Sequence, residues 1–222
     1  MDARRLPPAV VAAASDRAGG ALEVAATAVD GLLAVAGDPE LLEQAVTVLE
    51  AGQPAMAPIW HLAVAARGPD PPSALAALRA RLAADADAAV DTATAWLLDH
   101  LAAHAVGGQR GTVATVSHSS LVDRVLAQAG PRSAPGDPVV GVVGADAIGP
   151  GGLLNAVGTR ELVGRVPTLV VATAVKLVPA EVFGRLGGAG FEVVPLATVT
   201  AVVVGGEVLS PAEAGRRAAG LG

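Results

Sequence analysis

The sequence contains no cysteine and no tyrosine, and aromatic residues make up only 2% of its 222 residues. Without cysteine the chain can form no disulfide, thiolate nucleophile or cysteine metal site, so we expect a cytoplasmic protein. Hydrophobic residues nevertheless reach 52% of the chain. Because so few of them are aromatic, the core must be built mainly from alanine, valine and leucine.

Long apolar runs are also missing. The longest apolar stretches, such as Phe191 to Gly206, are interrupted by polar residues, so none reaches the roughly 18 residues of a membrane span. Near the N-terminus, Asp16 and Arg17 follow a short apolar run too soon for a signal peptide. The net charge of −6, with scattered arginines, argues against nucleic acid as a direct partner.

Lysine is almost absent, because Lys176 is the only one and every other basic residue is arginine. Lys176 follows a predicted strand from Thr168 to Thr173. A compact ammonium group at this place suits a phosphate or carbonyl site, and chance is the alternative explanation.

The first half of the chain has the apolar spacing of helices, separated by glycine and proline. Ser73 is predicted to cap the longest of them, and Gly107 and Gly108 end it. The predicted helical segments are Ala9 to Ala36, interrupted at Gly19 and Gly20, then Glu40 to Ala51, Ala55 to Ala66, and Ala74 to about Val106. These segments predict a helical domain over residues 1–108.

The second half alternates short apolar, β-branched segments with helical ones. Strands are predicted at residues 112–116, 139–143, 168–173, 191–194 and 199–204. Helices are predicted from Ser119 or Ser120 to Ala129, at about 154–163, at 180–186, and after Ser210. This alternation predicts a parallel, Rossmann-like sheet with flanking helices over residues 109–222.

Asp146 is the only charged residue between Pro138 and Thr159. It follows the predicted strand Val139 to Val143, in a turn rich in glycine. Ligands of open α/β sheets bind at the carboxyl ends of the strands, so Asp146 is a candidate site residue. The alternative is that its carboxylate only fixes the turn by accepting backbone N–H bonds.

Ser117, His118 and Ser119 follow the first strand and therefore belong to the same edge of the sheet. Hydroxyl and imidazole groups beside a helix N-terminus suit anion or phosphate binding. A hydrolase triad is disfavoured, because no glycine flanks the serine as a nucleophile elbow requires. The remaining alternative is that Ser119 only caps the helix.

His100 and His104 are spaced as a metal-binding pair on a helix. They lack the glutamate of a His-Glu-x-x-His motif and have no evident third ligand. We therefore expect no metal and no cofactor.

The segment VVGADAIGPGGLLNAVGTREL resembles the signature of the regulatory alpha, beta and delta subunits of translation initiation factor 2B. That family is related to methylthioribose-1-phosphate isomerase and ribose-1,5-bisphosphate isomerase. Further similarity lies in DRAGGALEVA, QPAMAP, TVSHSS, TAVKLVP and FEVVPLATVTAVVVGGEVLSPAEA, so the resemblance covers nearly the whole chain.

The resemblance implies a helical N-terminal domain, a Rossmann-like domain and a sugar phosphate bound between them. The related isomerases use a cysteine and an aspartate, and Asp146 matches the aspartate. Asn155 matches a neighbouring asparagine of the site, whereas Ser117 stands at the cysteine position. A serine hydroxyl is a far poorer acid than a thiol, so proton transfer there would be severely weakened.

Other positions also depart from the family pattern. Ala156 stands where the family has a lysine, and Gly19 stands where it has an arginine on the phosphate side. Between the helix ending near Ala129 and the next strand, the family carries additional strand and helix units, and here only Gly130 to Pro138 remain. We therefore expect a reduced sheet.

Together, these observations predict an α/β fold with an N-terminal helical domain and a reduced Rossmann-like parallel sheet. We expect an initiation factor 2B-like homodimer that binds a phosphorylated sugar or nucleotide in the cleft between its domains, without isomerase activity. The alternatives are an active sugar-phosphate aldose–ketose isomerase and a structural subunit with a relic pocket. The predicted ligand-binding residues are Ser117, His118, Ser119, Asn155 and Lys176, with Asp146 as the catalytic residue if the protein is active.

Overall fold

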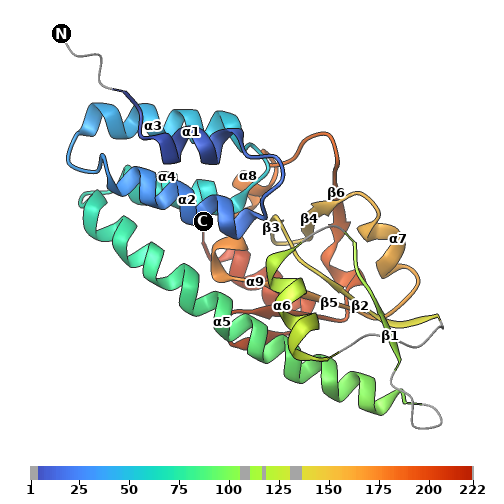
Figure 1. Ribbon diagram of the computed structural model, residues 1–222. Helices are drawn as coiled ribbons and strands as arrows, with labels where there is room; N and C mark the ends of the chain where they lie inside the picture. Colours follow the sequence, from blue (N-terminus) through green and yellow to red (C-terminus); the bar gives the residue numbers. More distant parts are fainter. Residues whose placement is uncertain (1–4, 106–110, 117–118, 131–136, 222) are drawn as a thin grey trace. The chain divides into compact units, whose positions relative to one another are not determined.

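The computed structural model describes residues 5–105, 111–116, 119–130 and 137–221 (Figure 1). The chain divides into two compact units, Met1–Ala83 and Ala84–Gly222, so the division falls inside helix α5 (Pro71–Ala103). The predicted domain boundary between residues 108 and 109 lies within residues 106–110, which are outside the described residues, so it stays a prediction. The units are described separately below.

The first unit is helical, as predicted. It consists of α1 (Pro8–Ser15), α2 (Ala21–Leu33), α3 (Pro39–Gly52), α4 (Ala57–Ala66) and the first part of α5. Asp16 ends α1 by accepting the backbone N–H groups of Ala18 and Gly19 at 2.8 and 2.7 Å. The predicted cap of α5 at Ser73 is wrong, because Asp70 accepts the Ser73 N–H at 3.3 Å and the helix begins at Pro71.

Small residues let these helices approach closely. A Cβ on Gly52 would lie 2.4 Å from the carbonyl oxygen of Ala14, so only glycine fits there. The buried Gln53 amide donates to the carbonyl oxygens of Ala13 and Asp16, both at 2.7 Å. These bonds satisfy carbonyl groups at the end of α1 that the helix itself leaves unpaired.

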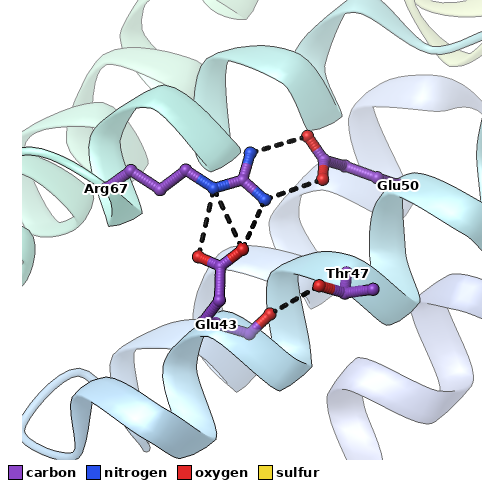
Figure 2. A network of polar contacts seen from close by, with 4 residues as sticks. All are labelled: Glu43, Thr47, Glu50 and Arg67. Carbon is purple, nitrogen blue, oxygen red and sulfur yellow. Dashed lines mark hydrogen bonds and ion pairs between the residues drawn. The ribbon is translucent and has the colours of Figure 1, made fainter.

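Arg67, the residue after α4, joins two turns of α3 (Figure 2). Its guanidinium donates to Glu43, with a shortest distance of 2.7 Å, and to Glu50 at 2.9 Å. The hydrogen bonds from Arg67 hold the pKa of Glu43 below its usual range. Arg67 and Glu43 also line a surface cavity of about 330 Å³ within the first unit.

The second unit contains a mostly parallel main sheet, which confirms the predicted α/β fold class (Figure 1). Its strands are β1 (Thr112–Ala114), β2 (Pro138–Val143), β5 (Thr168–Ala172), β7 (Ala201–Val204) and β8 (Glu207–Leu209), in that spatial order. Helix α6 (Ser120–Gln128) lies between β1 and β2 in the sequence, and the two strands are direct neighbours in the sheet, as expected for a reduced sheet. Strand β8 was not predicted, and it returns antiparallel to β7 through Gly205, which has a φ of +56°.

A second, antiparallel sheet corrects part of the sequence interpretation. It contains β3 (Ala147–Ile148), β4 (Gly152–Ala156) and β6 (Phe191–Pro195). The predicted helix from about Leu154 to Val163 is therefore wrong: its first residues form β4, and helix α7 covers only Thr159–Val163. Gly158, at a φ of +103°, separates the two elements. The predicted strand near Phe191 exists, but it pairs with β4 and not with the parallel sheet.

Two layers cover the main sheet within the second unit. On one face, α6 meets the C-terminal part of α5, where Arg124 donates to Asp87 at 2.6 Å. On the other face, one buried cluster joins the main sheet, the second sheet, α7 and α9 (Pro211–Ala219). Its largest members include Val143, Ile148, Leu153, Leu162, Val170, Leu177, Val194 and Val202. This cluster fixes the β3–β4 hairpin, and with it Asp146, against the end of β2.

Candidate functional site

The carboxyl ends of β1, β2 and β5 meet at one edge of the main sheet, because these strands pair in parallel. Ser119 follows β1, Asp146 follows β2, and Thr173 and Lys176 follow β5. All of these residues lie in the second unit. Two further predicted site residues, Ser117 and His118, lie outside the described residues.

Asp146 is half-buried at the start of the β3–β4 hairpin, and its backbone N–H donates to the Leu154 carbonyl at 2.9 Å. Burial raises the pKa of its carboxyl group, and the positive charge of Lys176 opposes this rise. Asp16 shows the contrasting case, because backbone N–H bonds from Gly19 and Ala18 lower the pKa of that turn aspartate. Among the described residues, no such bond contributes at Asp146, which argues against a purely turn-fixing role.

The hairpin that carries Asp146 is held by close contacts on both sides. A Cβ on Gly149 would lie 2.4 Å from Cγ of Phe183 in α8 (Ala180–Phe183). A Cβ on Gly215 would lie 2.3 Å from the carbonyl oxygen of Pro150. These contacts leave the hairpin little room to shift relative to the sheet.

Lys176 is the last residue of a 3-10 helix, η1 (Ala174–Lys176), and is only 4% exposed. Leu177 forms a parallel bridge with Ile148, and the Val178 N–H donates to the Ile148 carbonyl at 2.9 Å. These backbone contacts hold the segment after η1 beside the hairpin that begins at Asp146. Burial lowers the pKa of Lys176 to about 8, against an opposing effect of the Asp146 charge.

Thr173 lies between β5 and Lys176 and was not predicted as a site residue. Its side chain is fully buried, and its hydroxyl oxygen has no hydrogen-bond partner among the described residues. Such buried hydroxyls are normally paired, because an unpaired one costs about 1–3 kcal/mol. The only sequence signal was a polar residue at the end of a buried apolar strand.

Ser119 caps α6, as the simpler of its two interpretations predicted. Its hydroxyl oxygen lies 3.5 Å from the Val122 nitrogen, a long capping contact. A Cβ on Gly144 would lie only 2.8 Å from the Ser119 hydroxyl oxygen, so this glycine lets the start of α6 approach the end of β2. A contact between Ser119 and a ligand stays a prediction.

Asn155 is buried on β4, next to the residue that accepts the Asp146 N–H. Its amide donates to the Thr159 hydroxyl at 3.1 Å, and that hydroxyl donates to the Ala156 carbonyl at 2.8 Å. The amide therefore joins β4 to the start of α7. Its predicted role in ligand binding stays a prediction.

The candidate metal pair on α5 is engaged in other contacts. The His100 ring stacks between Trp96 and His104, with centroid distances of 4.9 and 4.3 Å. His104 Nδ1 lies 2.8 Å from the His100 carbonyl oxygen. Within the described segments, no group of three or more potential ligands is arranged to hold a metal ion.

The candidate site thus combines an amine, a carboxylate and a hydroxyl at the ends of neighbouring strands. Such a set can pair with an anion, accept hydrogen bonds from sugar hydroxyls and move a proton. Within the part of the chain that the structure describes, no helix has the length and apolarity to cross a membrane.

Neither a protein-family model nor a curated protein matches this sequence. Solved structures do match it. The Pyrococcus horikoshii OT3 translation initiation factor eIF-2B has a TM-score of 0.69 at 17% identity, covering 93% of this chain and 98% of that one. The eIF2B-beta2-delta2 complex from C. thermophilum, a tetramer, has a TM-score of 0.66 at 13% identity, covering 96% and 93%.

An isomerase structure is similar as well. The 5-methylthioribose 1-phosphate isomerase from Pyrococcus horikoshii OT3 has a TM-score of 0.56 at 15% identity, covering 96% of this chain and 86% of that one. At such identities a structural likeness establishes the fold and leaves the activity open. The chain therefore has the fold of the eIF2B subunits and of 5-methylthioribose 1-phosphate isomerase, as its sequence resemblance predicted.

Proposed function

We propose that this protein binds a phosphorylated sugar or nucleotide at the carboxyl edge of its main sheet, without the activity of the structurally similar 5-methylthioribose 1-phosphate isomerase. The observation that carries this proposal is the burial of Lys176, whose charge interacts electrostatically with that of Asp146. A buried ammonium group lowers the stability of the folded state, so its retention favours a role in binding. The chain keeps its only lysine at this position.

The chemistry of the edge suits both halves of such a ligand. A phosphate group is bound by a cation together with hydroxyl and N–H donors, which Lys176, Thr173 and the start of α6 can supply. A sugar presents hydroxyl groups, and a carboxylate such as that of Asp146 can accept hydrogen bonds from them. The positive charge of Lys176 therefore suits the phosphate of such a ligand, and the negative charge of Asp146 suits its sugar hydroxyls.

The sequence argues that the isomerase reaction itself is lost. The resemblance places Ser117 where the related isomerases have a catalytic cysteine, and Ala156 where they have a lysine. A hydroxyl with an ordinary pKa is a much weaker proton donor than a thiol. Ligand binding does not require a proton donor at position 117 or at position 156.

Thermal unfolding with a panel of sugar phosphates and nucleotides tests the binding proposal. A ligand at 100 times its Kd stabilises the folded state by about 2.7 kcal/mol, and the midpoint rises accordingly. We expect Lys176→Met to lose this response and Arg165→Met, which removes an exposed cation of the same unit, to keep it. If no compound raises the midpoint at millimolar concentration, the structural-subunit alternative is favoured.

The isomerase alternative has one observation in its favour. The pKa of Asp146 is raised and that of Lys176 is lowered to about 8, so both pKa values lie nearer to neutral pH than usual. Groups with such pKa values are suited to proton transfer between adjacent carbons of an aldose and a ketose. Incubation with ribose-1,5-bisphosphate or methylthioribose-1-phosphate, followed by assay for the ketose, tests it. Ketose formation that Asp146→Asn abolishes would establish the isomerase.

We also propose that the chain forms a homodimer. The supporting observation is the fold that it shares with the subunits of the tetrameric C. thermophilum complex. Size-exclusion chromatography with light scattering, over a range of protein concentrations, should give twice the chain mass of 21.7 kDa. A constant monomer mass would exclude a stable dimer.

A further inference from the structure

We propose that Lys176 forms a reversible imine with the open-chain carbonyl group of the bound sugar phosphate, and that Asp146 transfers the proton this reaction requires. The inference rests on the proposed function, because it names the chemistry of a ligand in the same site. It assigns Lys176 a covalent role, where an ion pair alone would require only a positive charge.

The choice of lysine at this position is the first support. Every other basic residue in the chain is arginine, so the composition strongly disfavours lysine elsewhere. An ion pair with a phosphate is formed as well or better by arginine, which binds it with two parallel hydrogen bonds. Arginine keeps its proton in proteins and offers no nucleophilic amine, whereas lysine does.

The surroundings of Lys176 are the second support. Its side chain is 4% exposed, and its chain neighbours Val175, Leu177 and Val178 are buried as well. This burial lowers the pKa of the amine to about 8, so a substantial fraction is neutral and nucleophilic near physiological pH. A lysine amine on a protein surface, with an ordinary pKa of about 10.4, remains almost fully protonated at that pH.

Asp146 supplies the acid–base partner. Its carboxyl group is half-buried, its pKa is raised by burial, and it interacts electrostatically with Lys176. The contacts of Ile148 with Leu177 and Val178 fix the two chain segments side by side. The carboxyl group therefore belongs to a segment that is held beside that of Lys176, and its burial raises its affinity for a proton.

The reaction balances without any further reactant. The nitrogen lone pair of neutral Lys176 attacks the aldehyde carbon, and a C–N bond forms as the C=O π bond breaks. The Asp146 carboxyl group gives its proton to the carbonyl oxygen, and its carboxylate then takes one proton from the nitrogen, which leaves a neutral carbinolamine. Asp146 gives this proton to the carbinolamine hydroxyl group, which leaves as water while the nitrogen lone pair forms the C=N bond. The remaining N–H proton returns to the Asp146 carboxylate, so the net reaction releases one water molecule and restores the carboxyl group. Hydrolysis reverses each step, so no oxidant or reductant is consumed.

Reductive trapping tests the proposal directly. The 222-residue chain is incubated with ribose 5-phosphate and cyanoborohydride, and the adduct is located by mass spectrometry of peptides. We expect one added ribityl 5-phosphate group on the peptide that contains Lys176. Apart from the chain's terminal amine, no other primary amine exists to compete, because Lys176 is the only lysine.

Matched variants and ligands separate covalent chemistry from binding. Lys176→Arg keeps the positive charge and should give no internal adduct. Ribitol 5-phosphate has no carbonyl group, so it should raise the unfolding midpoint and leave no trapped product. Asp146→Asn should slow trapping at least tenfold even at saturating ribose 5-phosphate, where a weaker affinity for the sugar no longer limits the rate.

The outcomes distinguish the two levels of inference. A midpoint shift with ribose 5-phosphate but no adduct on Lys176, or an adduct only on the terminal amine, would overturn the imine and leave the binding function standing. Trapping at an equal rate in denatured protein would also overturn it, because the folded site would then contribute nothing. If neither sugar phosphate shifts the midpoint and no adduct forms, both proposals fail for this class of ligand.

Discussion

At neutral pH Lys176 carries its charge in a buried position, which destabilises the second unit. Raising the pH removes this charge, so the second unit should become more stable. Its pKa is about 8 in the folded protein, compared with 10.5 for an unperturbed lysine. Between these values the unfolded chain binds more protons than the folded one, so the free energy of unfolding rises with pH. Below pH 8 both states are protonated, and the full cost of the buried charge is present.

The size of this effect follows from the two pKa values. Their difference corresponds to about 3 kcal/mol at about 1.4 kcal/mol per pH unit, and it should accumulate between pH 8 and pH 10.5. The composition makes this window unusually clean. The chain has no cysteine and no tyrosine, and Lys176 is its only lysine, so no other type of side chain has an ordinary pKa between pH 8 and pH 10.5. Arginine titrates only at much higher pH.

Urea unfolding between pH 7 and pH 10.5 measures the effect. In a Trp60→Phe background, Trp96 becomes the only tryptophan, and it lies in the second unit with Lys176. The urea midpoint should rise by about 1–3 M across the window, given the usual slopes for small proteins. Lys176→Met should be more stable at pH 7 and show a flat profile. Parallel profiles for the two proteins would refute the buried, low-pKa amine.

Two further predictions concern packing and charge. Gly149→Ala should destabilise the second unit by about 1–3 kcal/mol, because its Cβ would lie 2.4 Å from the Phe183 ring; Gly151→Ala, with no atom within 4 Å, should be nearly neutral. Equal urea midpoints for these variants would contradict the close contact. Arg67→Met should cost the first unit up to about 1 kcal/mol, read by Trp60 in a Trp96→Phe background, since these charges are largely exposed. Arg79→Met, which removes a pair with the single carboxylate of Asp30, should cost less, and 1 M salt should erase most of both effects.

The strands of the main sheet could be predicted because their sequences decide their burial. β2 and β5 are short apolar runs bounded by glycine, proline or threonine, which is typical of strands covered on both faces. The turn after β2 and the lone carboxylate of Asp146 follow from the same pattern. Lys176 was identified because it is the only lysine and because it follows a predicted strand.

The second sheet could not be predicted in the same way. The residues of β4 are few and have no clear period, so a helix and a strand fit them equally well. Pairing with β6 selects the strand over the helix. Leu154, for example, lies opposite Val193, which comes nearly forty residues later in the chain. Thr173 was missed for a related reason, because its burial without a partner depends on neighbours that local sequence does not reveal.

Phosphate binding and imine formation make opposite demands on the proton of Lys176, and this difference separates them in one titration. A bound phosphate stabilises the ammonium form, so the affinity for ribitol 5-phosphate should fall as the pH rises through about 8, the pKa of Lys176. An imine requires the neutral amine, so trapping of ribose 5-phosphate should accelerate over the same range. If affinity and trapping rate change together with pH, one residue cannot serve both roles. In that case the phosphate must be held elsewhere at the sheet edge, and the Thr173 hydroxyl and the start of α6 are the candidate groups.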